Sequence, residues 1–407
     1  MIKTYRIIIL SLISLITFNA FSQETAGFTY DVYGYVNAQY FYNTRKNYAV
    51  VDGLFSLYPL PPLLNEKGED LNAVDNHYFS VSTTRIGTKL NFGKTKGADI
   101  FGVIEVDFTG QADGMANYLR LRHAYIQTNW EKAQLLVGQY WNPMTLPQMM
   151  PSNKEMHNGA PFHPFGRLYQ IRLEYQPAEK LNILSVLSFQ RDYATIGVSN
   201  SKDYTQQIRS FIPITNLHLQ YVSDNFFAGI GGEFKAIKPR ETFLTPNNQT
   251  LRMNETMYNF STSAYFNYKV KNHDLKSQAI IGDNLNDMTI LGGYYESAFD
   301  TINNKFNYHP TTTFASWLDY TLTIGDFKPG LLLGYTMNLD IDTKGYINAY
   351  GLGMNIDNYY RISPRLEYTI NSKFSLSLCV EYQNVKFNDV SKRVKGYKLA
   401  LNATYNF

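Results

Sequence analysis

The chain has 407 residues, a formal charge of +3 and a slightly negative mean hydropathy, and it contains 33 Tyr and 26 Phe but only one Cys. A bundle of transmembrane helices would be far more apolar, and the small charge leaves no electrostatic footprint for a nucleic acid. The single Cys379 excludes an intrachain disulfide and a cluster of cysteine metal ligands.

The first 22 residues have the pattern of a secretory signal peptide. Lys3 and Arg6 precede an apolar run from Ile7 to Phe18, and the segment 20–22 (Ala-Phe-Ser) then offers small residues at the −3 and −1 positions of a cleavage site. The run is short for a membrane span, and no later apolar stretch approaches the ~20 residues that a spanning helix needs. We expect cleavage after residue 22 and a mature protein of residues 23–407.

Alternation of apolar and polar residues with a period of two predicts strands along the whole mature chain. It is clearest at the end, where Tyr397, Leu401, Tyr405 and Phe407 lie on one face and polar residues lie on the other. The predicted strands cover residues 28–44, 76–92, 98–110, 118–131, 134–141, 167–177, 181–192, 206–222, 226–237, 254–270, 274–283, 311–324, 328–339, 357–370, 374–387 and 394–407.

Every second connection between these sixteen strands is a tight turn, such as Gly93 to Gly97 and Lys271 to His273, and most of the others are long. Short turns at one end, long loops at the other, an even strand number and both termini at the short end are typical of a membrane barrel. We therefore expect an all-β fold, a transmembrane antiparallel β-barrel of about 16 strands in the outer membrane of a Gram-negative bacterium. Phe407 would mark the periplasmic end and act as the assembly signal for the barrel assembly machinery.

Three consecutive segments then resemble strands of the DcaP-like outer-membrane porin family: Gly102 to Phe108 (GVIEVDF), Leu119 to Tyr125 (LRLRHAY) and Leu135 to Trp141 (LLVGQYW). Ser82 to Leu90 resembles the strand before them, and the match spans roughly residues 78–147. Members of this family are sixteen-stranded, commonly trimeric porins linked to the uptake of small anions such as dicarboxylates. The resemblance therefore implies a sixteen-stranded barrel, a homotrimer and passive transport.

Charged residues on the polar faces of the strands are the candidate pore lining. A charge on the lipid face near the midplane costs roughly 2–4 kcal/mol, so these side chains are expected to face the lumen. The substrate-guiding candidates are Arg85, Lys89, Glu105, Asp107, Arg120, Arg122, Arg172, Arg361 and Arg365. One interpretation is an unpaired basic ladder that guides anions, because the planar guanidinium suits carboxylate and phosphate oxygens. The other is pairing of these arginines with carboxylates on neighbouring strands, with little selectivity left.

The third long connection, residues 142–166, is rich in Pro and Met. We expect it to fold into the barrel and constrict the pore, as the third loop does in the porins that the chain resembles. Its polar contacts in the pore would be Lys154, Glu155, His157 and His163. The alternative is an external loop packed at a subunit contact.

Catalysis and metal chemistry find little support in the sequence. The seven His are scattered, and none has the spacing of a zinc-binding helix or lies in a nucleophile motif. His218 is the nearest candidate for a triad on the barrel wall, but it lacks an evident Ser partner, and His123 falls on the apolar face. We expect no enzyme activity, no metal and no cofactor.

The sequence thus predicts a porin for passive diffusion of small hydrophilic solutes, including ions, with a preference for small anions such as dicarboxylates. Its expected partners are these solutes, outer-membrane lipids, the assembly machinery and two further copies of the chain. The alternatives are a non-selective diffusion pore and a structural or adhesin barrel that binds an external partner through the loops 45–75 and 284–310. Sixteen strands leave a water channel, whereas a small barrel is filled by side chains, which favours transport. The apolar stretch Leu57 to Leu64 would pack over its own barrel rim or against a neighbouring protomer.

Overall fold

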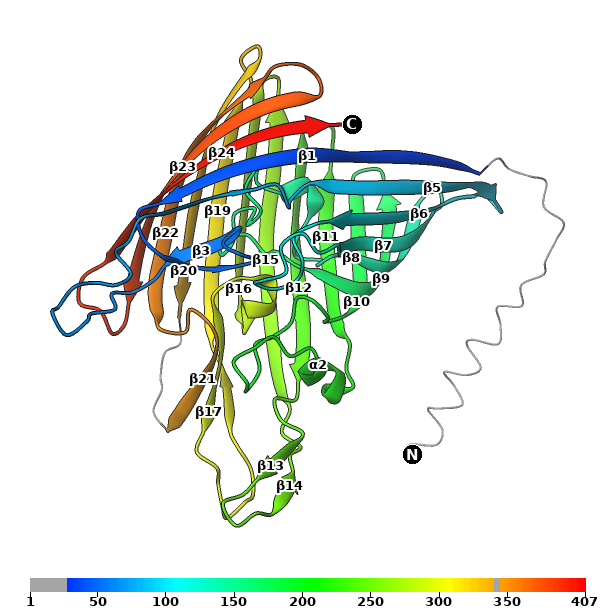
Figure 1. Ribbon diagram of the computed structural model, residues 1–407. Coiled ribbons are helices and arrows are strands. Elements are labelled where there is room, and N and C mark those ends of the chain that lie inside the picture. Colours follow the sequence, from blue (N-terminus) through cyan, green and yellow to red (C-terminus); the bar gives the residue numbers. More distant parts are fainter. Residues whose placement is uncertain (1–27, 340–344) are drawn as a thin grey trace.

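A computed structural model describes residues 28–339 and 345–407, and the expected signal peptide 1–22 lies outside these ranges. The described chain forms one large antiparallel sheet that closes on itself, because its first strand pairs with its last (Figure 1). No helix within these ranges has the length and apolarity to cross a membrane. The predicted fold class, an antiparallel β-barrel, is confirmed.

The barrel wall contains seventeen strand segments, which follow one another in sequence order. Both β4 and β5 pair with β1, so these two segments form one interrupted strand of the wall. The barrel is therefore sixteen-stranded. The wall strands are β1 (Thr29–Asn43), β4 (Asn76–Ser80), β5 (Arg85–Thr95), β6 (Ala98–Asp107), β7 (Arg120–Asn129), β8 (Ala133–Trp141), β9 (Arg167–Ala178), β10 (Leu181–Phe189), β11 (Ile214–Val222), β12 (Phe226–Ile237), β15 (Met257–Val270), β16 (His273–Asp283), β19 (Thr312–Leu322), β20 (Phe327–Asn338), β22 (Ile356–Thr369), β23 (Phe374–Phe387) and β24 (Val394–Asn406).

The seam between β1 and β24 closes the barrel next to Phe407. Val36 lies opposite Tyr405, and the backbone of Phe407 exchanges two hydrogen bonds with that of Gly34, at 3.1 and 3.2 Å. Closure leaves no sheet edge with unpaired backbone groups, which a bilayer could not hydrogen-bond. Phe407 and Tyr405 point outward as the alternation predicts, whereas Lys398 and Asn402 of the same segment are buried in the interior.

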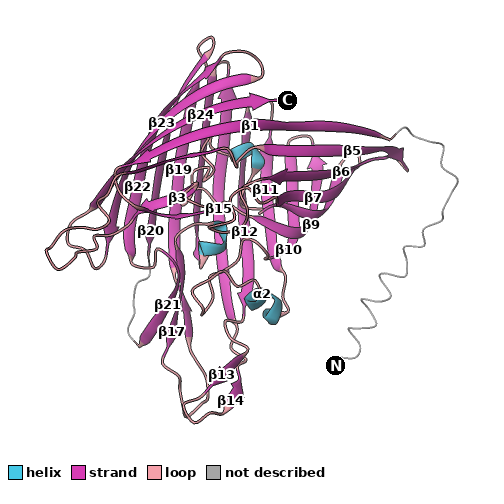
Figure 2. Cartoon of the chain, viewed as in Figure 1, coloured by secondary structure: helices cyan, strands magenta, loops and turns pink. Residues whose placement is uncertain are grey.

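The loops at one end carry their own elements (Figures 1 and 2). We number them in chain order: loop 1 is 44–75, loop 2 is 108–119, loop 3 is 142–166, loop 4 is 190–213, loop 5 is 238–256, loop 6 is 284–311, loop 7 is 339–355 and loop 8 is 388–393. Their elements are β2 (Asn47–Val50), β3 (Phe55–Pro59), the 3-10 helices η1 (Pro147–Met149) and η2 (Leu285–Met288), α2 (Thr205–Ser210), β13 (Thr242–Leu244), β14 (Thr250–Arg252), β17 (Gly292–Ser297), β18 (Tyr308–Pro310) and β21 (Tyr346–Leu352). In Figure 1, β13, β14, β17 and β21 project beyond the wall, at the end opposite the C-terminus.

Two strand predictions were wrong in detail. The segment 206–222 begins as the helix α2, and the strand β11 starts only at Ile214. Pro213 explains the break, because it donates no backbone hydrogen bond and restricts the residue before it. The predicted strand 76–92 is interrupted at 81–84, where the backbone N–H of Thr84 turns back to the carbonyl of Val81.

Candidate pore and constriction loop

Loop 3 lies inside the barrel, because side chains of several wall strands hydrogen-bond its backbone. Gln39 of β1 donates to the carbonyl of Lys154 at 3.2 Å, and Lys276 of β16 donates to the carbonyl of Met150 at 3.0 Å. The backbone N–H of Ser152 donates to Asp319 of β19 at 2.8 Å. These partners come from well-separated parts of the wall, so the loop crosses the lumen.

A glycine of β20 makes room for the loop. A Cβ at Gly334 would come within 2.2 Å of the Phe162 ring, so any side chain here would collide with loop 3. Phe162 is fully buried and its ring lies 4.9 Å from that of Tyr359. The inward side of β20 therefore serves as the seat of this aromatic residue.

Loop 1 also enters the barrel mouth, which the sequence analysis did not foresee. The strand β3 pairs with β2, and its residues Phe55, Leu57 and Tyr58 are buried. Arg361 of β22 donates to the carbonyl of Leu57 at 3.2 Å. The expectation of rim packing holds only in part, because Leu57 and Tyr58 turn inward whereas Leu63 and Leu64 stay exposed. The apolar run in a loop was the only sequence signal for this insertion.

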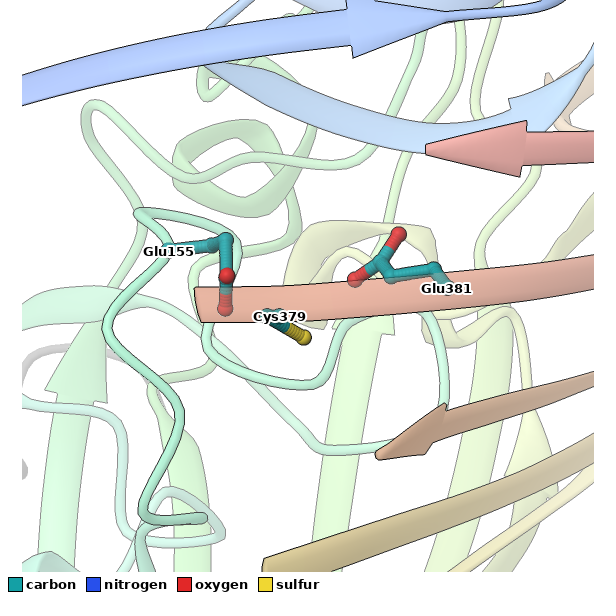
Figure 3. Close-up of side chains that lie close together, drawn as sticks. All are labelled: Glu155, Cys379 and Glu381. Atoms are coloured by element: carbon teal, nitrogen blue, oxygen red, sulfur yellow. The ribbon is translucent and has the colours of Figure 1, made fainter. Parts of the chain in front are cut away.

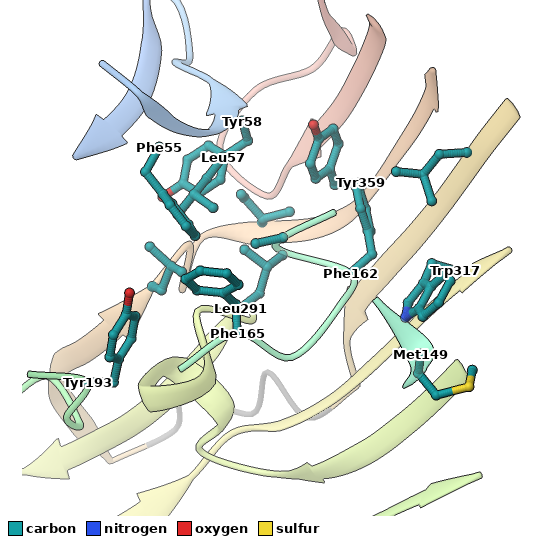
Figure 4. Packing of buried hydrophobic residues seen from close by; sticks show 14 of the residues in the cluster. Phe55, Leu57, Tyr58, Met149, Phe162, Phe165, Tyr193, Leu291, Trp317 and Tyr359 are labelled. Carbon is teal, nitrogen blue, oxygen red and sulfur yellow. The ribbon is translucent and has the colours of Figure 1, made fainter. Parts of the chain in front are cut away.

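An apolar cluster fills the mouth where the inserted loops meet (Figure 4). It combines Phe55 of loop 1, Phe162 and Phe165 of loop 3, Tyr193 of loop 4 and Leu291 of loop 6. The wall contributes Trp141, Trp317, Leu332, Tyr359, Val385 and Phe387 among others. Burial of these side chains removes apolar surface from water and holds the loops together without any covalent link.

Arg361 is the polar centre of this assembly. Besides Leu57 it contacts the carbonyl of Ala160 at 2.6 Å and the carboxylate of Glu381 at 3.2 Å. His157 is fully buried beside it, with Nε2 3.0 Å from the carboxylate of Glu381. Since a buried charge is tolerated only when paired, the site fixes loops 1 and 3 in one arrangement around Arg361.

The predicted pore contacts of loop 3 were half wrong. Lys154 and Glu155 line a cavity, but His157 and His163 are fully buried and do not. His163 packs edge-on against Trp317 with ring centroids 5.3 Å apart, and burial lowers its pKa to about 3. Both imidazoles face the barrel wall instead of water because the loop packs on that side.

Three potential ligand groups come together where loop 3 meets β23 (Figure 3). Glu155 of the loop points toward Cys379 and Glu381 of β23, and their ligand atoms all lie within 4.8 Å of one another. Glu381, however, is already paired with Arg361, and one carboxylate oxygen of Glu155 accepts a hydrogen bond from Asn153 at 3.0 Å. Cys379 is buried as a free thiol. We therefore interpret this cluster as a contact that packs loop 3 against β23.

The unpaired basic ladder is contradicted by the ion pairs on β6 and β7. Arg120 binds Asp107 through two nitrogens, at 3.0 and 2.6 Å, and Arg122 bridges Glu105 at 2.8 Å and Asp107 at 2.9 Å. Arg85 lies 3.5 Å from Glu105. The alternative interpretation, pairing across strands, is the correct one here, since adjacent strands bring side chains of one face within reach.

The outward placement of His123 was also wrong. A register shift between Glu105 and Val106, opposite His123, marks a β-bulge in the pair β6–β7. The bulge puts Arg122 and His123 both on the interior side, and the following exposed residue is Ile126. One extra residue reverses the faces of all that follow, which simple alternation cannot anticipate.

The remaining candidates are also engaged on the wall. Arg172 pairs with Glu174 at 2.8 Å, and Arg365 binds Asp319 at 2.5 and 3.1 Å. Lys89 lies over the ring of Phe101 at 4.3 Å. Asp319 was not among the residues that the sequence pattern singled out.

The triad candidate His218 contacts a tyrosine of β15. His218 is buried and hydrogen-bonded through Nδ1 to the hydroxyl of Tyr265 at 3.1 Å. Gln220 donates to the same hydroxyl at 3.0 Å. The arrangement is a polar contact between β11 and β15 across the intervening strand β12.

Three cavities open beneath loop 3, on the side of the short turns. The first, about 240 Å³, lies between loop 3 and the wall at Arg85, Asp107 and Arg122. The second, about 480 Å³, is lined by six cationic residues, Lys154, Lys269, Lys271, Lys276, Lys328 and Arg365, and by two acidic ones, Asp274 and Glu367. The third, about 380 Å³, is lined by uncharged polar residues, such as Gln148 and Asn182, and by two cationic and two acidic residues, Lys132, Arg172, Glu131 and Glu174. Loop 3 residues border all three, so the interior below it is polar and open to water.

Solved structures with the same architecture are outer-membrane channels. The outer membrane channel DcaP of Acinetobacter baumannii superposes with a TM-score of 0.69 at 16% identity, over 95% of this chain and 99% of that one. This chain has the porin fold. The anion-selective porin from Comamonas acidovorans gives a TM-score of 0.57 at 9% identity over 94% and 100% of the two chains. The trimer form of OmpT of Vibrio cholerae gives 0.56 at 10% over 94% and 100%.

No protein-family model matches the sequence, and no curated protein does. The porin fold with an apolar outer wall and a polar interior places the chain in the outer membrane of a Gram-negative bacterium, where closed barrels of this kind reside. The short turns and Phe407 then lie at the periplasmic end, and the long loops lie outside.

Proposed function

We propose that this barrel is a passive diffusion pore for small hydrophilic solutes, with a preference for small anions such as dicarboxylates. The observation that supports it is the excess of cationic residues in the second cavity beneath loop 3, six against two acidic ones. Cations along a water-filled path raise the local concentration of anions. The resemblance to a DcaP-like porin and to an anion-selective porin points the same way.

A non-selective pore is the second candidate, because the wall at Arg120 and Arg122 is paired with Glu105 and Asp107 and carries no net charge from these four residues. Planar-bilayer recordings separate the two functions. In a gradient of potassium chloride, an anion-selective pore gives a reversal potential with the sign of the chloride equilibrium potential. Succinate should then reduce the chloride current more than a neutral sugar does, because the sugar only occupies volume in the pore. A reversal potential near zero together with equal effects of succinate and sugar would leave only the non-selective pore.

We further propose that loop 3 sets the constriction. It crosses the lumen and is bound to β1, β16, β19 and β22. Deleting residues 152–159 should raise the single-channel conductance, and a variant lacking the same number of residues from the projecting loop 6 is the matched control. An unchanged conductance in the loop 3 deletion rules out this role.

We also propose that the leader is cleaved after residue 22. N-terminal sequencing of the membrane-inserted protein tests this.

Two further proposals concern assembly. We propose a homotrimer, in line with the trimer form of OmpT; light scattering of the detergent-solubilised protein should give three times the mass of one chain. Phe407 borders the β1–β24 seam, so Phe407→Ala should slow barrel assembly, which heat-modifiable migration reports.

A further inference from the structure

We infer that the second cavity beneath loop 3 is a binding site for multivalent oxyanions, of the class of organic phosphates and polyphosphates, at the periplasmic exit of the pore. The inference rests on the proposed function, since only a conducting barrel delivers solutes to this cavity. We call the cavity the basic vestibule and define it by Lys154, Lys269, Lys271, Lys276, Lys328 and Arg365.

The vestibule has more positive charge than its own carboxylates neutralise. Lys154 and Lys328 share one partner, Glu367, at 3.3 and 3.5 Å. Lys269 at the end of β15 and Lys271 in the turn to β16 form no ion pair within residues 28–339 and 345–407. Two separated groups of cations, one at that turn and one between β20 and loop 3, thus lack full compensation.

The arrangement favours a ligand with more than one anionic group. Arg365 is held by Asp319 across Gly330, where a Cβ would come within 2.6 Å of the guanidinium carbon. Lys276 is held by the Met150 carbonyl at 3.0 Å and lies 3.7 Å from Asp274. Arg365 and Lys276 are thus engaged with the wall and with loop 3. The lysines on the two sides of the vestibule, Lys269 and Lys271 on one and Lys154 and Lys328 on the other, remain for a bound anion. A ligand that contacts the lysines on both sides of the vestibule therefore needs at least two anionic groups.

The size of the cavity points to the same class. At about 480 Å³ it falls within the range of small-molecule sites. A single chloride would leave most of this space to water and would contact the lysines on only one side of the vestibule. An organic phosphate or a short polyphosphate fills more of it and offers several oxygens to the ammonium groups. The other two cavities beneath loop 3 have no such charge excess.

The test uses the full-length barrel in planar bilayers at low salt, with tripolyphosphate as the probe. Added from the periplasmic side, tripolyphosphate should block the current at lower concentration than succinate, and acetate should block least. The double variant Lys269→Gln/Lys271→Gln should raise the half-blocking concentration by roughly tenfold or more, as expected for the loss of charge-assisted contacts.

The matched control is Lys180→Gln/Lys373→Gln, which removes the same charge from two other turns at the same end of the barrel, away from the vestibule. It should leave the half-blocking concentration unchanged. Equal shifts in both double variants would mean that surface potential alone attracts the probe, and equal block by succinate and tripolyphosphate would also overturn the site. An anion-selective current without block by tripolyphosphate refutes the vestibule site alone, whereas a barrel that does not conduct refutes the pore itself.

Discussion

Arg361 donates a 2.6 Å hydrogen bond to the carbonyl oxygen of Ala160, and this contact ties the middle of loop 3 to β22. The same guanidinium holds the carbonyl of Leu57 in loop 1 and the carboxylate of Glu381. Two loops that are about one hundred residues apart in the chain thus share one cationic anchor, and the mouth of the barrel is organised around it.

Replacing this anchor should open the mouth. Arg361→Ala leaves the carboxylate of Glu381 buried without its guanidinium partner, which typically costs about 3–5 kcal/mol. We expect a higher single-channel conductance and heat-modifiable migration at a lower temperature. Arg361→Lys keeps the charge but loses the planar guanidinium that reaches both loops. Its conductance should therefore lie between that of the wild type and that of the alanine variant. Conductance equal to wild type in the alanine variant would show that the apolar cluster alone holds the loops.

The seat of Phe162 can be tested at Gly334. A methyl group in Gly334→Ala meets the Phe162 ring and must displace it, and overpacking of this kind costs about 1–3 kcal/mol. We expect more frequent current fluctuations, because loop 3 loses a defined position. Gly232→Ala is the control, since a Cβ there has only one neighbour, at 3.9 Å. Quiet channels from both variants would argue against close packing at β20.

The paired wall makes a directional prediction about Arg120 and Arg122. In Arg120→Gln/Arg122→Gln, the carboxylates Glu105 and Asp107 lose their strongest partners. The net charge of the first cavity then becomes more negative, so the reversal potential in a potassium chloride gradient should shift toward cation preference. Glu105→Gln/Asp107→Asn should shift it in the opposite direction. Unchanged potentials in both would show that ions do not pass this wall.

The buried imidazole of His163 should make stability depend on pH. Its folded-state pKa is about 3, lowered chiefly by burial, whereas that of an exposed histidine is about 6.5. Below about pH 6.5 the unfolded chain takes up a proton that the folded loop refuses, so folding free energy is lost as the pH falls, at roughly 1.4 kcal/mol per pH unit until about pH 3.

His163→Gln removes this titration. Between pH 6.5 and 4.5 the wild type should lose roughly 2–3 kcal/mol more unfolding free energy than the variant, measured by urea unfolding in detergent. The comparison cancels the titration of carboxylates common to both proteins. Parallel pH profiles for the two proteins would mean that His163 becomes solvated or protonated in the folded loop.

The barrel architecture could be predicted from the sequence alone. Alternation of period two, sixteen strands, short turns such as Lys271 to His273 and the outward row that ends at Phe407 all follow from local pattern, because each strand must present one face to lipid and one to water. The lumenal side of Arg120, Arg122, Arg361 and Arg365 followed from the same rule.

The contacts of these residues, in contrast, became known only from the folded structure. The partners of Arg361 lie in loop 1, loop 3 and β23, and that of Arg365 is Asp319 across a neighbouring strand, so no sequence spacing reveals them. The bulge opposite Glu105 and the close approach at Gly334 depend on strand register and on the packing of a distant loop. Local alternation fixes which way a side chain points, whereas its charge balance depends on contacts that form only when the barrel closes.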